Sequence, residues 1–449
     1  MKYFRPEEVC DFLQKDVNTP EKTAVFDSPC FENNNFLLRP FGGFAYVPLR
    51  IPESIDVFVS PMGCARHCEA DIVMEGKRDR LFRMPLKESE LVTGDGEQVL
   101  CRELDQFLAQ MEPEKRPKAI TITITCIDAL LATDYSRTER MLQEKYGIRM
   151  AIAKMFPLIR QNKKHNGDLL MEALYSLVQC PEDRRGKKVV NLLGSSEKLN
   201  RDTDFFAVLE KAGYQVRQIH DCQTLEEYDA LGEACLNVVI NNHSVHAAKL
   251  LQKKLGIPYV EFFECFYLDE IRDNYKKLET ALGVSLEYEK YFCQAKQKLA
   301  EVLEKAKDKT WAVGGKVDYD PTKFIYDFTR TGFNVKYILA KRFKKSELKY
   351  YQWYRENKPD LMIYPSLDME MMYFFYQPEP ADLLIGAEEY LFFMAPNMRP
   401  VDIGEEPFDF VTFVRALDQI EACLAPRDGS GMQWGGEPSV FDRKWMQWG

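Results

Sequence analysis

The hydrophobic residues of this chain fall into short apolar runs that alternate with longer stretches of helical periodicity. The runs at 54–59, 119–125 and 188–193 have the length and the β-branched content of buried strands. The stretches between them carry apolar residues three and four positions apart, and several end at a glycine, as the segment 140–147 does. This alternation of strand and helix predicts an α/β protein with parallel sheets.

Further runs of the same kind divide the chain into successive strand–helix units. In the first unit, helices are expected at 97–111 and 140–146. The second unit is predicted to hold strands at 188–193, 215–220, 236–240 and 259–263, with helices at 202–212, 225–233 and 245–255. After a charged helix at 288–307, the third unit is expected to contain a strand from 311, a helix at 320–331, and strands at 335–339, 361–364 and 383–385.

Changes in composition indicate where these units are separated. The polar segment 180–187, Cys-Pro-Glu-Asp-Arg-Arg-Gly-Lys, interrupts the apolar pattern and marks a boundary. We therefore predict three Rossmann-like α/β/α domains with parallel sheets, at residues 1–180, 181–300 and 301–425. A polar tail rich in glycine and tryptophan follows at 426–449.

Charge and cysteine usage narrow the class of protein. The net charge of −10 argues against a nucleic-acid-binding protein, and the basic segment 336–349 fits a solvated helix surface better than a phosphate site. No apolar run approaches the roughly 20 residues of a membrane helix, and the charged start of the chain does not fit a secretory signal. Twelve cysteines in such a chain are expected to be thiols of a cytoplasmic protein.

Three of these cysteines share one kind of position, the point where a strand runs into a loop. Cys30 follows Phe-Asp-Ser-Pro, Cys64 closes a strand and a Pro-Met-Gly turn, and Cys126 ends the strand 119–125. Open α/β sheets place ligands at such strand ends. Soft thiolates gathered there suit an iron–sulfur cluster better than a hard cation. One ligand of a four-ligand site would be missing, which points to a second subunit.

With these motifs the chain resembles the nitrogenase component 1 superfamily over residues 27–425. The likeness rests on the order of the three cysteines, on Ser-Pro-Met-Gly-Cys64 beside the family's Gly-Pro-x-Gly-Cys, and on Thr-Cys126 at a strand end. The strand that ends at Gly194 and the later Gly-Ile-Pro258 are similar to the middle domain of the nitrogenase α subunit.

The resemblance implies a fold of three α/β/α domains and a cluster site at a subunit interface. It assigns Cys30, Cys64 and Cys126 as the cluster ligands and Gly63 to the turn whose backbone approaches the cluster. The cluster would hold four irons or eight, and Cys68 is a further ligand candidate. Expected partners are a sister subunit in a heterotetramer, or a second copy of this chain, and a dimeric ATP-hydrolysing iron protein that delivers electrons.

Two departures from the nitrogenase pattern bear on the reaction. Where nitrogenase holds its molybdenum–iron cofactor with a cysteine of the middle domain, this chain has Asn241, and no histidine follows His246. The resemblance therefore implies neither that cofactor nor dinitrogen reduction. The expected substrate is a small molecule or a tetrapyrrole-like compound.

A candidate substrate pocket lies after the strand 236–240. Asn241, His243 and His246 follow its carboxyl end, and the two histidines are candidate proton donors because the free imidazole group titrates near neutrality. A purely structural role, with Asn242 or Ser244 capping the next helix, is the alternative.

Other features leave the reaction open. Cys265 ends the next strand, either as a pocket thiol or as a packed core residue. The chain has no phosphate loop and no Gly-x-Gly-x-x-Gly after a strand, which argues against ATP or dinucleotide binding. We predict an oxidoreductase: a nitrogenase-like reductase subunit. The alternatives are a non-catalytic scaffold for cofactor assembly in the same superfamily and a redox-free ligand-binding α/β protein.

Overall fold

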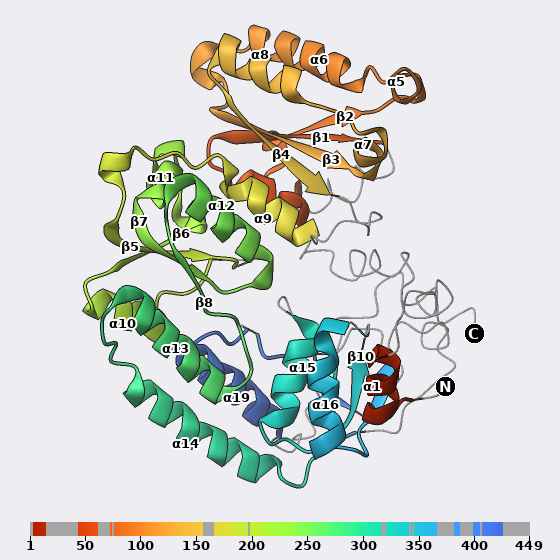
Figure 1. Cartoon of the computed structure of the whole chain (residues 1–449), viewed down its shortest axis with the longest axis vertical. Coiled ribbons are helices and arrows are strands. Elements are labelled where there is room, and N and C mark those ends of the chain that lie inside the picture. The colour runs from red at the N-terminus through yellow and green to blue at the C-terminus, as the bar shows by residue number, and fades with distance from the viewer. Residues whose placement is uncertain are drawn as a thin grey trace, which may run out of the picture.

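The structure is a computed structural model that contains three parallel β-sheets, which follow one another along the chain and along the long axis of the molecule (Figure 1). It describes residues 3–14, 44–61, 72–73, 76–155, 166–195, 198–315, 320–340, 343, 345–365, 381–386, 398–404 and 406–424. Among these residues, no helix is long and apolar enough to cross a membrane. The predicted α/β class with parallel sheets is confirmed.

The first sheet has four parallel strands in the order β2-β1-β3-β4. They are β1 (Ser54–Ser60), β2 (Leu81–Pro85), β3 (Ala119–Thr125) and β4 (Arg149–Met155). Helices α6 (Gly96–Gln110) and α8 (Ser136–Tyr146) cover one face, and α9 (Asn166–Ser176) packs on the other beside the 3-10 helix η1 (Phe44–Arg50). Between β2 and α6 lies the short α5 (Glu88–Thr93).

The alternating sequence of β3 does not produce a polar face in solvent. Thr121 and Thr123 are as fully buried as their neighbours Ile120 and Ile122, because β3 is a central strand with helices over both faces. A central parallel strand is covered on both sides whatever its pattern.

The middle sheet also has four parallel strands, in the order β6-β5-β7-β8. They are β5 (Lys187–Leu193), β6 (Gln215–Gln218), β7 (Ala234–Val239) and β8 (Tyr259–Glu261). The connecting helices are α10 (Asp204–Lys211), α11 (Leu225–Asp229) and α12 (Val245–Leu255), and Gly256 ends α12 in the left-handed conformation, as the sequence predicts.

The third sheet has five parallel strands in the order β11-β10-β9-β12-β13. They are β9 (Trp311–Val313), β10 (Val335–Ala340), β11 (Met362–Pro365), β12 (Leu383–Ile385) and β13 (Arg399–Val401), with α15 (Pro321–Arg330) and α16 (Leu348–Asn357) beside them. The expectation of a helix surface at 336–349 is wrong for its first part, because Lys336 lies in β10.

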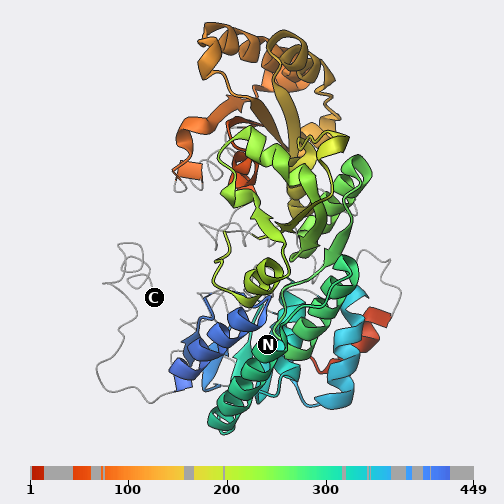
Figure 2. The ribbon, with the colours of Figure 1, turned by 90° about the vertical axis from the view of Figure 1, so that its left-hand side faces the viewer.

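Helices from distant parts of the chain join the middle and third sheets. Helices α13 (Leu268–Leu282), α14 (Glu289–Ala306) and α19 (Phe410–Leu424) pack together below the middle sheet (Figures 1 and 2). Helix α1 (Pro6–Gln14) lies against α16, and Phe4 forms an antiparallel bridge with Ile363 of β11. Residues near the start of the chain thus pack with the third sheet.

The hydrophobic core is continuous between neighbouring sheets. One buried cluster joins Ala153 of β4 and Leu174 of α9 to Leu251 of α12. A second joins Phe205 of α10 to Trp311 of β9 and to Phe413 of α19. Because the same buried side chains serve two sheets, the relative positions of the sheets are fixed by core packing.

Two buried aspartates hold α10 and α19 together end to end. Asp204 at the start of α10 accepts the Val411 N–H of α19 at 2.7 Å, and Asp409 accepts the Phe205 N–H of α10 at 3.2 Å. Each carboxyl group therefore satisfies the open N-terminus of the other helix. The Tyr275 hydroxyl also donates to Asp204, at 2.6 Å. Burial and the neighbouring Asp409 carboxyl raise the pKa of Asp204 to about 7.

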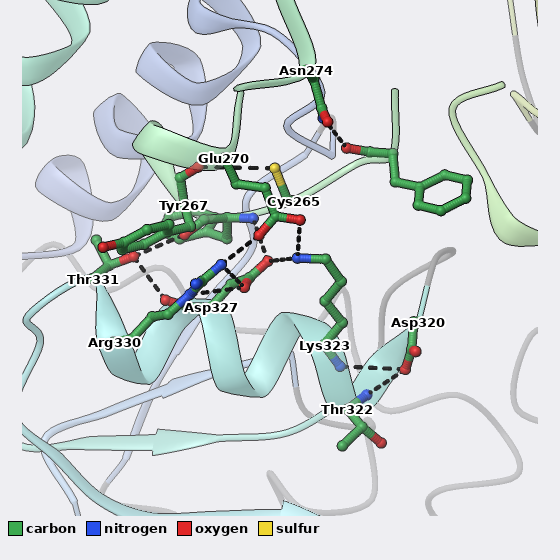
Figure 3. A network of polar contacts seen from close by, with 12 residues as sticks. Cys265, Tyr267, Glu270, Asn274, Asp320, Thr322, Lys323, Asp327, Arg330 and Thr331 are labelled. Atoms are coloured by element: carbon green, nitrogen blue, oxygen red, sulfur yellow. Dashed lines mark hydrogen bonds and ion pairs between the residues drawn. The ribbon is translucent and has the colours of Figure 1, made fainter. Parts of the chain in front are cut away.

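A buried network of four charges joins the loop after β8 to α15 (Figure 3). Asp327, fully buried, accepts the Phe266 N–H at 3.2 Å and the Lys323 ammonium at 2.7 Å, while Arg330 lies 2.8 Å from its other oxygen. Glu270 of α13 binds the same Lys323 at 2.9 Å and also Arg330. Two anions meet two cations, so the network is neutral.

The pKa values of the two carboxyl groups in this network shift in opposite directions. Burial raises the pKa of Asp327 although Lys323 and Arg330 oppose the shift. For Glu270, burial also acts to raise the pKa, but the same two cations outweigh it and the pKa is lowered. Arg330 in addition stacks 3.7 Å above the Tyr267 ring.

We predict that Asp327→Asn lowers the free energy of unfolding by about 3–5 kcal/mol, because it leaves two buried cations with one anion. Chemical denaturation monitored by circular dichroism measures this loss. The matched control is Asp273→Asn on α13, whose carboxylate is 60% exposed and pairs with Lys276 at the surface, and which should change stability little. Equal effects of the two substitutions would contradict the role given to the buried network.

Asp56 is a buried carboxyl group within β1. Its Oδ1 accepts the Thr123 hydroxyl at 2.8 Å, while its Oδ2 has no hydrogen-bond partner among the described residues. Burial raises its pKa to about 7, against the opposing effects of the Thr123 hydrogen bond and the Arg80 charge. The folded chain therefore holds this proton more tightly than the unfolded chain, whose aspartate titrates near 3.8.

This shift predicts a pH-dependent benefit of Asp56→Asn. The stability that the wild-type carboxyl group contributes is complete below about pH 4 and is lost as the pH rises through about 7. The asparagine has no such loss. The stability of the variant minus that of the wild type should thus be about 2–4 kcal/mol more favourable at pH 8.5 than at pH 5. Urea denaturation at both pH values measures it, and a constant difference would contradict the assignment.

Candidate functional site

Cys126 is the member of the predicted cysteine triad that the structure describes. It is the first residue of the short helix α7 (Cys126–Leu131), directly after the central strand β3, and it is partly exposed. The position confirms a strand end for Cys126. Cys30, Gly63, Cys64 and Cys68 lie outside the described residues.

The turn that presents Cys126 is stabilised by hydrogen bonds to the Asp128 carboxyl group. The Thr125 N–H donates to Asp128 Oδ2 at 3.1 Å, and the Tyr135 hydroxyl donates to Oδ1. Burial raises the pKa of Asp128 although these hydrogen bonds oppose the shift. Ala132 then ends the helix in the left-handed conformation, with φ of 51°. The thiol thus stands on a rigid turn.

The exposed face of α7 is apolar. Leu130 and Leu131 are 75% and 47% exposed, and they follow Cys126 and Ile127 one helical turn later. Large apolar side chains that remain exposed beside a thiol are typical of a surface that another protein covers. A partly exposed sulfur at the end of a buried strand also fits the soft ligand set of an iron–sulfur cluster.

Asn241, at the carboxyl edge of the middle sheet, is engaged within the chain. Its Oδ1 accepts the His243 N–H at 3.0 Å, and its Nδ2 donates to Glu264 Oε2 at 3.3 Å. Asn241 therefore caps the short 3-10 helix η7 (Asn242–Ser244), a role that the sequence analysis gave to Asn242 or Ser244. Gly194, with φ of 111°, lies close to Asn241. A Cβ at position 194 would lie only 2.9 Å from the Asn241 backbone nitrogen, so a glycine is needed there.

Glu264 brings a buried carboxyl group to the same place. It lies in the loop after β8, where its N–H donates to Ile240 O at 2.9 Å. Burial, followed by the nearby Glu406 carboxyl, raises its pKa well above the usual value, and the Asn241 hydrogen bond only partly offsets this. Burial therefore favours the protonated form of this carboxyl group.

His243 links this edge of the middle sheet to the neighbouring unit. Its Nδ1 lies 2.8 Å from Asp168 Oδ1 in the first turn of α9, and the side chains are 26% and 14% exposed. Helix α9 packs on both β4 and α12, so this pair spans the boundary between the first and middle sheets. His246 follows on α12 and is partly exposed.

Cys265 is a core residue. It has no exposed surface, its Sγ lies 3.9 Å from Tyr267 O, and burial raises the pKa of its thiol. The structure thus places it in the packing between the middle and third sheets (Figure 3). A thiol held neutral in this way is inert.

Four polar residues near this edge were not predicted: Arg50, Asp168, Glu264 and Glu406. Arg50, which is buried, donates to Ser195 O at 3.2 Å and so links η1 to the loop after β5. The sequence offers a signal for one of them only. Asn-Gly-Asp168 precedes an apolar helical stretch, a pattern that starts helices and places a carboxylate in the first turn. The other three become neighbours only through the fold.

The comparison with protein families agrees with this geometry. The model of the nitrogenase component 1 type oxidoreductases matches residues 39–400. The chain belongs to this family. The predicted superfamily is therefore confirmed, as is its three-sheet fold.

Relatives within the component 1 family are nitrogenase iron-molybdenum cofactor biosynthesis proteins NifE. The protein of Clostridium pasteurianum is 25% identical over 240 residues, which cover 52% of this chain and 51% of that protein. The protein of Methanococcus maripaludis is 24% identical over 253 residues, 54% and 51% of the two chains. The protein of Sinorhizobium fredii is 23% identical over 349 residues, 72% and 67%. The chain spans about half the length of the first two of these relatives.

Solved structures extend the likeness of fold over most of the chain. A structure titled "Nitrogenase Cp1 at pH 6.5" superimposes with a TM-score of 0.66 over 85% of this chain and 91% of its own, at 14% identity. The same protein at pH 5 gives a TM-score of 0.59 over 93% and 97%. At this identity the likeness concerns the fold alone.

Proposed function

We propose that this chain is the subunit of a cytoplasmic, nitrogenase-like reductase. In this proposal Cys30, Cys64 and Cys126 hold an iron–sulfur cluster, of four or eight irons, at the surface shared with a sister subunit or a second copy of the chain. An ATP-hydrolysing iron protein supplies the electrons. The substrate is a small molecule or a tetrapyrrole-like compound other than dinitrogen.

The observation that carries the proposal is the placement of His243. Reduction of a double bond takes up two electrons and two protons. The site therefore needs a proton donor. An imidazole at the carboxyl edge of a parallel sheet, partly exposed and hydrogen-bonded through Nδ1, meets this need. His246 is the second candidate donor, and Asn241 holds the His243 backbone in place.

The cysteine site is supported by the surface around Cys126. When bound, an iron–sulfur cluster supplies one-electron transfer at low potential. The chain contributes a sulfur on a rigid turn and the exposed apolar side chains Leu130 and Leu131 next to it. These side chains suit burial against a partner subunit, which would also shield the site from water.

A scaffold for cofactor assembly is the second candidate function. It is favoured by the similarity to the NifE proteins, whose name states a role in biosynthesis of the iron-molybdenum cofactor. A scaffold holds a cluster and hands it on, whereas a reductase turns over a substrate. Turnover therefore separates the two functions.

We predict that Cys126→Ser reduces the iron content of the isolated protein by at least half without unfolding it, because the residue is partly exposed and serine is a poor ligand for iron. Iron analysis and circular dichroism measure the two effects. The control is Cys293→Ser, which removes an exposed thiol of α14 and should leave iron unchanged. Full iron content in Cys126→Ser would exclude Cys126 as a ligand.

The test of function is electron consumption from a cognate iron protein, with ATP and candidate substrates present. We expect ATP-dependent product formation, and we expect His243→Ala to lower kcat by about 10²–10⁴ while iron content stays normal. His246→Ala is the companion variant that tests the second candidate donor in the same assay. The contrary result would be a cluster-loaded protein that consumes no electrons with any substrate and instead transfers its cluster to another protein. That result would favour the scaffold function over the reductase function.

A further inference from the structure

The His243 side chain is held by a carboxylate from a different part of the fold. Asp168 Oδ1 lies 2.8 Å from Nδ1, a distance typical of a charge-assisted hydrogen bond. The two residues are 75 positions apart in sequence and come from α9 and η7. Nothing in the local sequence around His243 requires this partner, so the contact is a product of how the first and middle sheets pack.

Gly167 makes the close approach possible. A Cβ at this position would lie 2.8 Å from His243 Cγ and 2.9 Å from its Nδ1, closer than side chains tolerate. The imidazole ring therefore lies directly over the backbone of the first turn of α9. A residue with any side chain at position 167 would push the ring away from Asp168.

Both partners are fixed by structure that lies outside the pair. The His243 N–H is bound by Asn241 Oδ1 at 3.0 Å, which fixes the backbone of η7. Leu170 and Leu174 of α9 are buried in the cluster that also contains Leu251 of α12. The pair thus has little freedom to separate, as an oriented acid–base group requires.

We propose that Asp168 is a positioning residue that holds neutral His243 in the tautomer with the proton on Nδ1. The carboxylate accepts that proton in a hydrogen bond, so Nε2 carries the lone pair and becomes the nitrogen that exchanges protons with a ligand. When Nε2 gains a proton, the carboxylate stabilises the imidazolium. When Nε2 gives the proton to a reduced substrate, the neutral Nδ1–H tautomer returns.

Only the use made of the proton rests on the proposed reductase function. The tautomer itself is a property of the folded chain. It can therefore be measured without substrate, iron protein or ATP, and its outcome does not depend on whether turnover is found.

The test is ¹⁵N NMR of the full-length protein labelled at histidine, at about pH 8.5, where ordinary imidazoles are neutral. The chain has five histidines, so His243→Gln identifies the His243 signals by their loss. We expect Nδ1 to be the protonated nitrogen in the wild type. In Asp168→Asn, whose amide N–H₂ can donate to Nδ1, we expect the proton to move largely to Nε2. A wild-type Nε2–H tautomer, or the same tautomer in both proteins, would overturn the proposal.

Two further variants exclude a general structural effect. Gly167→Ala keeps the carboxylate but displaces the ring, and we expect it also to lower the Nδ1–H population. His246→Gln changes the neighbouring histidine and should leave the His243 tautomer as it is. If Asp168→Asn does not fold, the wild-type spectrum and Gly167→Ala still decide the question. A Gly167→Ala protein with an unchanged His243 tautomer would argue against positioning by Asp168.

Turnover provides the link to function. If the reductase function is correct, Asp168→Asn lowers kcat by about 10²–10³ with little change in KM, because the substrate still binds but meets the wrong tautomer. If the tautomer shifts as expected but the wild type shows no turnover, the proposed reductase function is wrong and the positioning role of Asp168 still holds. Normal turnover in a variant with the shifted tautomer would show that the His243–Asp168 pair is not the proton donor.

Discussion

The buried carboxylate of Asp327 is the contact on which the arrangement of the middle and third sheets depends. It binds a backbone N–H of the loop after β8 while two cations of its own helix neutralise it, so a loop of one unit is fixed to a helix of the next. The Phe266 ring extends this contact into the core, where it packs against Phe328 of α15 and Phe413 of α19. The hydrogen bond to Asp327 orients the loop, and the aromatic packing adds buried apolar area to the same contact.

The same loop carries Glu264, so the contact with the third unit also determines the polar edge of the middle sheet. Cys265 N–H donates to Pro407 O at 2.9 Å, which holds the loop beside the segment that contains Glu406. From the other side, α9 brings Asp168 to His243. The edge therefore receives its acid–base groups from two boundaries between sheets. A shift at either boundary changes a hydrogen bond of the site, although the middle sheet itself stays intact.

The sequence predicted the regular part of this fold well, because buried parallel strands have strong local signals. The strand Ala119–Thr125 and the helix Val245–Leu255 were placed to the residue. Strands β2, β4 and β13 were missed: Leu81–Pro85 has no apolar run longer than two residues, the run in Arg149–Met155 is only four residues long, and Arg399–Val401 is a strand of three residues. The site was predicted in part: His243 follows from its strand end, but Asp168, Glu264 and Glu406 meet only in three dimensions. Four positions of the cysteine site, Cys30, Gly63, Cys64 and Cys68, lie outside the described residues and stay predictions.

The bonding of Asn241 bears on which chemistry this edge supports. A cysteine at this position would offer a soft thiolate to a metal, whereas the asparagine offers an amide that binds the His243 backbone at one end and Glu264 at the other. An amide oxygen is a hard and weak ligand for iron–sulfur species, and rotating it outward would break both hydrogen bonds. Asn241, which stands where a metal-binding cysteine would be needed, therefore has a structural role. The groups that remain suited to a reaction are an imidazole hydrogen-bonded to a carboxylate and a buried carboxyl group whose pKa is raised, and both kinds of group can transfer protons. This donor set suits the proposed reduction of a bound substrate better than the alternative scaffold function.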